Sequence, residues 1–113
     1  MRYVTNPPLL LLNLIVCVAV QAAPLDPKLI IGLKNGHVKS CVPTISRQIK
    51  SLGFNVSSQN AELYCECLGN LYFNDLTTEE YREIHDGPGG LPVRKANQRI
   101  AMQEYCAEVH LVN

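Results

Sequence analysis

The cysteines are the residues of this chain whose type and spacing most directly suggest chemistry. Cys65 and Cys67 are separated by a single residue, and Cys41 and Cys106 lie before and after that pair. Such a set could form a redox-active pair, a thiolate metal site or structural disulfides. Each chemistry makes a different demand on the elements that carry the sulfur atoms.

A redox-active pair would require Cys65 and Cys67 to bridge to each other. A disulfide needs its two Cβ atoms about 3.8 Å apart, whereas helical residues two positions apart point in directions that differ by roughly 200°. The pair also lies beside Glu62 and Glu66, and not in the electropositive surroundings that activate a thiol. The sequence therefore predicts no oxidoreductase.

A metal site is the second possibility. Histidines lie one helical turn from two of the cysteines, and the central pair could complete a thiolate-rich set. The candidate ligands are His37, Cys41, Cys65, Cys67, Cys106 and His110. The Cys-x-x-Cys knuckles of zinc ribbons are absent, and an oxidising compartment would consume the thiolates. A metal- or thiol-handling protein is thus the alternative, and we expect no metal or other cofactor.

Structural disulfides are the preferred interpretation of the same four cysteines. The chain has five cysteines, and loss of Cys17 with the expected signal peptide would leave these four. An even number in a short exported chain predicts two bridges, each stabilising the fold by about 2–4 kcal/mol. Cys41–Cys67 with Cys65–Cys106, or Cys41–Cys65 with Cys67–Cys106, would each give the central sulfurs separate partners. The path of the chain favours the first arrangement, and the residues leave the second open.

The N-terminal segment predicts export. Arg2 precedes an apolar run over residues 9–20, which leads to the cleavage pattern Val20-Gln21-Ala22. The run is shorter than the ~20 residues of a membrane-spanning helix. We therefore expect a secretory signal peptide over 1–22 and one periplasmic or secreted domain over 23–113, without a membrane partner after cleavage.

The size and charge of the chain limit its partners. With 113 residues it has room for one domain, and its ten Lys/Arg balance ten Asp/Glu. Loss of Arg2 with the signal peptide leaves that balance near zero, so nothing attracts nucleic acid. Disulfides would compensate for the modest core of such a small domain.

A central helix over 61–73 must position the cysteine pair. Its apolar residues recur at helical spacing: Ala61, Tyr64, Cys65, Leu68, Leu71 and Tyr72. Cys65 and Cys67 lie on opposite flanks of this stripe. Each sulfur should therefore face a different neighbouring segment.

Two short helices are expected before the central one. Residues 24–36 contain Asp26 as N-cap, although 29–31 could equally be extended. A second helix from Cys41 to Leu52 tolerates Pro43 only in its first turn. Gly53 would end it in the left-handed conformation, and the serines that follow can cap the central helix.

The best-marked helix start lies after the central helix. Thr77 and Glu80 have capping-box spacing, and Leu76 and Tyr81 occupy the hydrophobic-staple positions. The helix should end at the glycines of 87–90.

A last helix is expected over 93–109, after Pro92. Two apolar faces predict that its C-terminal half is covered on two sides. The first face comprises Val93, Ala96 and Ile100. The second face comprises Met102, Tyr105, Cys106 and Val109. The predicted fold is all-α, a small bundle of four to five short helices stapled by two disulfides.

No catalytic constellation accompanies these helices. Glu79, Glu80 and Glu83 fit the positive end of their own helix, and no histidine lies beside a nucleophile. The aromatic residues could line a small apolar pocket, although such spacing more often marks a core. They are Tyr64, Tyr72, Phe73, Tyr81 and Tyr105. We therefore expect no enzyme and assign no catalytic residue.

The motifs Tyr64-Cys65-Glu66-Cys67 and Leu76-Thr77-Thr78-Glu79-Glu80-Tyr81, with a final Cys106, resemble those of small exported bacterial helical proteins with four cysteines. That resemblance implies a periplasmic or secreted helical domain and transfers no functional residue. Insect odorant carriers also link helices through neighbouring cysteines, but their Cys-x-x-x-Cys spacing is not matched.

The sequence thus predicts an exported small helical binding or interaction module without catalytic activity. Its partner would be an unknown protein or a small apolar ligand.

Overall fold

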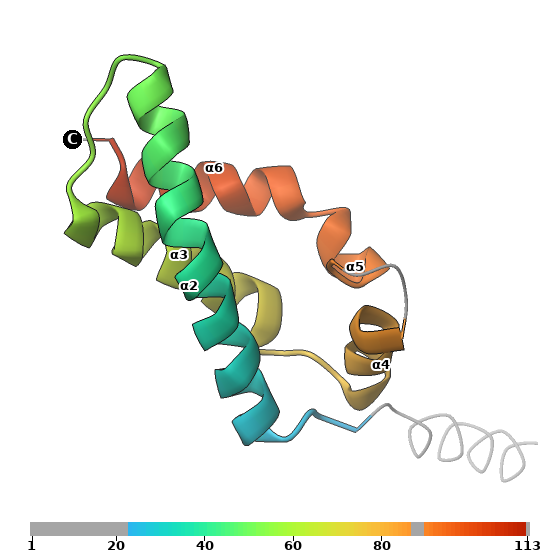
Figure 1. Ribbon diagram of the computed structural model, residues 1–113. Helices are drawn as coiled ribbons and strands as arrows, with labels where there is room; N and C mark the ends of the chain where they lie inside the picture. Colours follow the sequence, from blue (N-terminus) through green and yellow to red (C-terminus); the bar gives the residue numbers. More distant parts are fainter. Residues whose placement is uncertain (1–22, 87–89, 113) are drawn as a thin grey trace, which may run out of the picture.

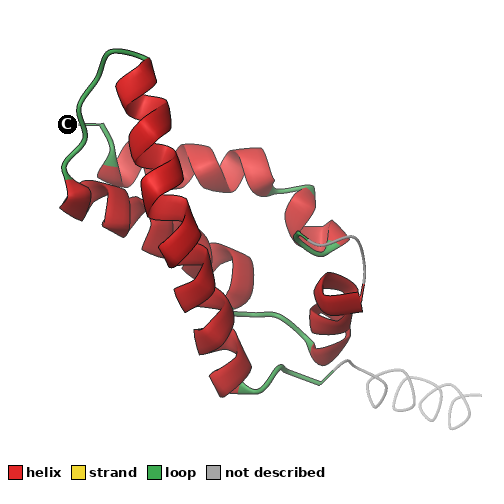
Figure 2. Cartoon of the chain, viewed as in Figure 1, coloured by secondary structure: helices red, strands yellow, loops and turns green. Residues whose placement is uncertain are grey.

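The computed structural model describes residues 23–86 and 90–112, and within them the protein is all-helical. The helices are α2 (Pro27–Ser51), α3 (Ser58–Phe73), α4 (Thr78–Asp86), α5 (Val93–Ala96) and α6 (Arg99–His110) (Figure 1). No strand occurs in these two ranges (Figure 2), where one isolated bridge pairs Pro24 with Thr77. The predicted all-α class is confirmed, and the predicted signal peptide over 1–22 lies outside the described residues.

Helix α3 is the centre of the fold, as its apolar spacing predicted. Ser57 caps its start by accepting a hydrogen bond from the Asn60 amide at 3.0 Å. Its buried residues recur at intervals of three and four: Ala61, Tyr64, Cys65, Leu68, Gly69, Tyr72 and Phe73. Both α2 and α6 pack against α3, and Figure 1 shows α2 lying across it.

The two disulfides join α3 to these two neighbours. Cys41 of α2 is bonded to Cys65, and Cys67 is bonded to Cys106 of α6. The prediction of two bridges to separate segments is confirmed, but the preferred pairing was wrong. Cys65 lies one turn before Gly69, where α2 approaches α3, so packing places Cys41 beside Cys65.

Helix α2 differs most from the prediction. Asp26 caps it as expected, accepting from the Lys28 amide at 2.9 Å, but one helix of 25 residues replaces the two predicted. Pro43 lies in its interior, where proline removes a backbone donor at a cost of about 3 kcal/mol. Contacts with α3 and the bridge outweigh that local preference. Gly53 has φ +87° beyond the helix end, as predicted.

The last helix was predicted as one element and is divided into α5 and α6. Within the described residues α6 packs mainly against α3 and its other face is exposed, so the predicted cover on two sides was wrong. Met102 and Cys106 are buried on that side. Tyr105 and Val109 are 58% and 53% exposed. Val93 and Ile100, predicted to share a face, are exposed as well.

Helix α4 begins with the predicted capping box. The Thr77 amide donates to Glu80 Oε1 at 3.1 Å, and the Glu80 amide donates to Thr77 Oγ1 at 3.2 Å. Leu76 is buried and Tyr81 packs against the same core, consistent with the predicted staple. The Leu25 amide donates to the Leu76 carbonyl at 3.1 Å and so ties the start of the domain to this turn.

A charged network attaches α5 to the end of α3. Lys95 is buried, donates to the Leu71 carbonyl at 2.7 Å and pairs with Asp75. Arg94 bonds Glu80 at 2.8 Å and Asp75 at 3.1 Å. Burial alone would raise the pKa of Asp75, but bonds to Lys95 and Arg94 lower it. The Arg94 bond likewise lowers the pKa of Glu80.

Candidate binding groove

A groove runs between α2 and α6, with α3 as its floor. Its first compartment, of about 320 Å³, lies over Tyr64, Leu68 and Tyr72 and reaches Gln103 of α6. The second, of about 310 Å³, lies beside Phe73 and includes Leu91 and Arg99. His37, Tyr72 and Gln103 line both compartments, so the two lie next to each other and together are called the groove.

The floor is aromatic and uncharged. Tyr64, Leu68 and Tyr72 lie four residues apart and are all buried, so one face of α3 carries them. Burial raises the pKa of Tyr64, and electrostatic repulsion from the neighbouring Tyr72 raises it further. Burial also raises the pKa of Tyr72, partly offset by a hydrogen bond with Gln103 and the charge of Arg99. Both side chains are therefore neutral phenols at physiological pH.

His37 packs edge-on against the aromatic residues at the junction of the two compartments. Its ring centroid lies 5.5 Å from that of Tyr72 and 6.0 Å from that of Phe73. Its Nε2 is buried without a hydrogen-bond partner among the described residues, and burial lowers the pKa of the ring. The side chain is therefore a neutral imidazole at neutral pH, held against α3 beside Gly69.

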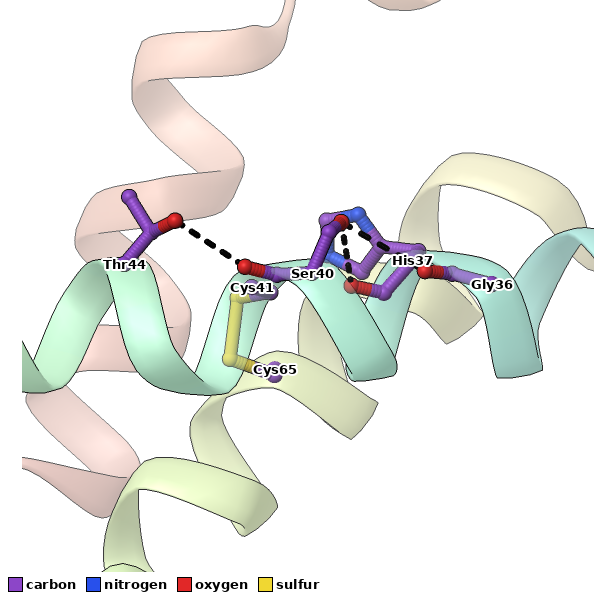
Figure 3. The surroundings of a disulfide bond; sticks show 6 residues. All are labelled: Gly36, His37, Ser40, Cys41, Thr44 and Cys65. Atoms are coloured by element: carbon purple, nitrogen blue, oxygen red, sulfur yellow. Dashed lines mark hydrogen bonds between the residues drawn. A yellow bond between two sulfur atoms is a disulfide. The ribbon is translucent and has the colours of Figure 1, made fainter.

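The α2 wall carries small polar residues around one disulfide. Thr44 Oγ1 donates to the Ser40 carbonyl at 3.0 Å, and Ser40 Oγ donates to the His37 carbonyl at 3.2 Å (Figure 3). These hydroxyls thus bond their own helix next to Pro43 and keep acceptor capacity toward the groove. Cys41 reaches the same wall, so the bridge to Cys65 forms part of it.

Among the residues that the structure describes, one charged side chain lines the groove. Arg99 lines the second compartment, and neither compartment has an aspartate or glutamate in its lining. A larger hollow of about 440 Å³ lies along the opposite flank of the α2–α3 contact, but its charges are of both signs. They are Lys34, Lys39, Glu62 and Glu66. That hollow resembles an ordinary solvated face, whereas the groove has an apolar floor with few polar groups.

The structure brings together only part of the predicted aromatic set. Tyr64, Tyr72 and Phe73 line the groove, but Tyr81 stacks on His85 of α4 at 5.7 Å and Tyr105 is largely exposed. The polar residues of the two walls were not predicted from the sequence; they are Ser40, Thr44, Gln48, Arg99 and Gln103. The spacing of Tyr64, Leu68 and Tyr72 was the available signal for the floor, and nothing in the sequence linked it to α6.

The residues of the alternative metal site are not assembled. All four sulfurs are bonded in disulfides, and His110 lies on the Cys67 side of α3, away from His37. Within 23–86 and 90–112, no three His, Cys, Asp or Glu residues form a group that could hold a metal ion. The oxidised cysteines therefore offer no thiolate ligand.

Two of the three glutamates expected at the positive end of α4 support the fold. Glu80 belongs to the capping box and the Arg94 ion pair, while Glu83 accepts from the Val93 amide at 2.9 Å. Glu79 is exposed in the first turn of α4. Glu80 and Glu83 thus have structural partners, and their contacts assign neither a catalytic role.

The chain was compared with known proteins at three levels. No family model, no curated protein and no solved structure matched it. A search of the helices in the described part of the chain found none with the length and apolar character needed to cross a membrane.

Proposed function

We propose that this protein is an exported, disulfide-stapled binding module that takes a small ligand with an apolar body into the groove. The observation that carries the proposal is the groove over Tyr64, Leu68 and Tyr72, in which uncharged polar groups of the walls surround an aromatic floor. Ligand sites commonly combine an apolar lining with a few polar groups that orient the ligand. The groove has both features.

The groove supports binding without catalysis. His37 is a neutral ring packed between helices, and the tyrosines keep their protons. The Ser40 hydroxyl donates to its own helix and is not bonded to a general base. An apolar ligand would therefore gain burial and orientation there.

Export is part of the proposal, with a periplasmic or secreted location. Two disulfides suggest an oxidising environment. The mass of the protein purified from the exported fraction should correspond to a chain that begins at Ala23. The four cysteines Cys41, Cys65, Cys67 and Cys106 should resist alkylation until their disulfides are reduced. Four alkylatable thiols in the native protein would defeat the structural disulfides and favour the metal- or thiol-handling alternative.

The binding test uses 1-octanol as a neutral apolar ligand, with backbone amide shifts of labelled protein as the measurement. Octanol should shift the amides of Tyr64, Leu68 and Tyr72 in a saturable way. Thr44→Phe places a large ring in the groove wall from an exposed helix position and should abolish saturation. Lys50→Phe, on α2 outside the groove lining, is the matched control. Equal binding by both variants would refute the location of the site.

A further inference from the structure

The distribution of charge along the groove selects a narrower class of ligand. We propose that the groove binds a small amphipathic carboxylate, with its apolar chain on Tyr64, Leu68 and Tyr72 and its carboxylate on Arg99. This inference rests on the proposed function and adds the chemical class of the ligand. It depends on three features: the partners of Arg99, the polarity of the groove from end to end, and its size.

Arg99 has no acidic partner in the described structure. The ion pairs there use Arg94 and Lys95, and the first turn of α6 contains no acidic residue. The segments 1–22 and 87–89, which the structure does not describe, contain no aspartate or glutamate. Neither segment can therefore supply a side-chain carboxylate to Arg99. The guanidinium is therefore available to an external anion.

The groove is polarised along its length. The first compartment is lined by uncharged side chains, while the second contains Arg99 beside Gln103 and Tyr72. The N-terminal end of α6 lies at the same position and adds a positive dipole end. A ligand with an apolar chain and one negative head would match both compartments in a single orientation.

The identity of the head group follows from the number of cations. A guanidinium matches a carboxylate through two parallel hydrogen bonds. A dianionic phosphate would leave its second charge without a partner at the edge of an apolar groove, which is unfavourable. One arginine in a lining without other charges therefore favours a monoanion.

The size of the groove limits the chain of the ligand. Each compartment has a volume near the lower end of the range for ligand pockets. Tyr64 and Tyr72 lie eight positions apart on α3, which corresponds to about 12 Å of floor. An extended medium-chain acyl group fits that length, whereas a long lipid would extend beyond it.

The test compares octanoate, 1-octanol and octylammonium at neutral pH on the full mature chain with its bridges intact, by calorimetry and amide shifts. Octanoate should bind about tenfold more tightly than octanol, and octylammonium should bind most weakly. Arg99→Gln should reduce octanoate affinity to the octanol level and leave octanol binding unchanged. Arg82→Gln, at an exposed arginine of α4, is the matched control and should retain the preference. Added salt should reduce the preference for octanoate, since Arg99 is exposed.

The outcomes separate this inference from the function on which it rests. Octanol binding as tightly as octanoate, or octanoate binding unchanged in Arg99→Gln, would overturn the carboxylate and leave the apolar groove standing. No binding of any of the three ligands would overturn both. An equal loss in Arg82→Gln would show that overall charge, and not Arg99, produces the preference, and would also overturn the inference.

Discussion

Removing each bridge separately is the most direct test of how the outer helices are held. Cys41 and Cys65 are separated by 24 positions, and Cys67 and Cys106 by 39. The chain-entropy relation for those loops gives about 3.5 kcal/mol for the first bridge and about 3.9 kcal/mol for the second. The paired alanine variants, C41A/C65A and C67A/C106A, should lose about these amounts of unfolding free energy.

The packing of the outer helices explains why such a loss would be severe. None of the residues of α2 is fully buried, and α6 contributes only Met102 and Cys106 to the core. A small domain is typically stable by about 5–15 kcal/mol, so either bridge accounts for a large share. Cys65 and Cys106 are fully buried, and their truncation adds a loss of packing to the entropic effect.

Urea unfolding followed by circular dichroism measures these losses through the midpoint and the slope of the transition. The two variants should have similarly lowered midpoints, because their entropic terms differ by only about 0.4 kcal/mol. Reduction of the unmodified protein should be more destabilising than either pair of substitutions. An unchanged midpoint in either variant would refute the argument that its bridge holds the outer helix.

The pairing itself can be checked on the same material. Proteolytic cleavage after Glu66 separates Cys65 from Cys67. Further cleavage between Cys41 and Cys65, and between Cys67 and Cys106, leaves each cysteine on its own fragment. Unreduced fragments should then link Cys41 with Cys65 and Cys67 with Cys106. Fragments that link Cys41 with Cys67 would refute the packing of α2 beside Cys65.

Three further predictions concern stability. Gly36→Ala should raise the unfolding free energy by about 1 kcal/mol, because alanine favours the helix and the added Cβ meets no atom within 4 Å. Gly53→Ala should lower the unfolding free energy, because φ is +87° at that position. Thermal unfolding of the two variants checks both effects. His37→Phe should stabilise the fold by about 1 kcal/mol by removing an unpartnered buried nitrogen. The lowered pKa of His37 means that stability falls as pH drops through 6.5 toward the folded value, and urea melts at several pH values should show this loss only with histidine. The lowered pKa values of Asp75 and Glu80 stabilise the fold at any pH above the ordinary carboxyl pKa. This stability should be lost as the pH falls through the pKa values of the two groups in the folded protein. Asp75→Asn should make the unfolding free energy depend less on pH in that acidic range.

The sequence predicts an element well where local spacing and burial agree. The stripe that includes Tyr64, Leu68 and Tyr72 identified α3, and Thr77 with Glu80 identified the start of α4, because both signals lie within one or two turns. The division of residues 27–51 into two helices failed for the same reason. Local rules penalise Pro43, whereas contacts with α3 determine the outcome.

The groove could not be predicted from local signals. Its walls come from α2 and α6, and Thr44 is separated from Arg99 by 55 positions in the sequence. Whether polar residues on two distant helices face the same space depends on which sulfur joins which helix. The sequence left both pairings open, so it could identify the floor and not the walls.

The Cys-x-Cys spacing itself explains why the groove lies over the tyrosines. Around the axis of α3, Cys67 lies about 160° from Cys65 by the shorter arc. Tyr64, Leu68 and Tyr72 lie about 100°, 60° and 20° from Cys65 within that same arc. The bridges therefore hold α2 and α6 at its two edges, so that Tyr64, Leu68 and Tyr72 lie between the two outer helices. The single pair Cys65 and Cys67 thus fixes both outer helices and places the aromatic floor of the groove between them.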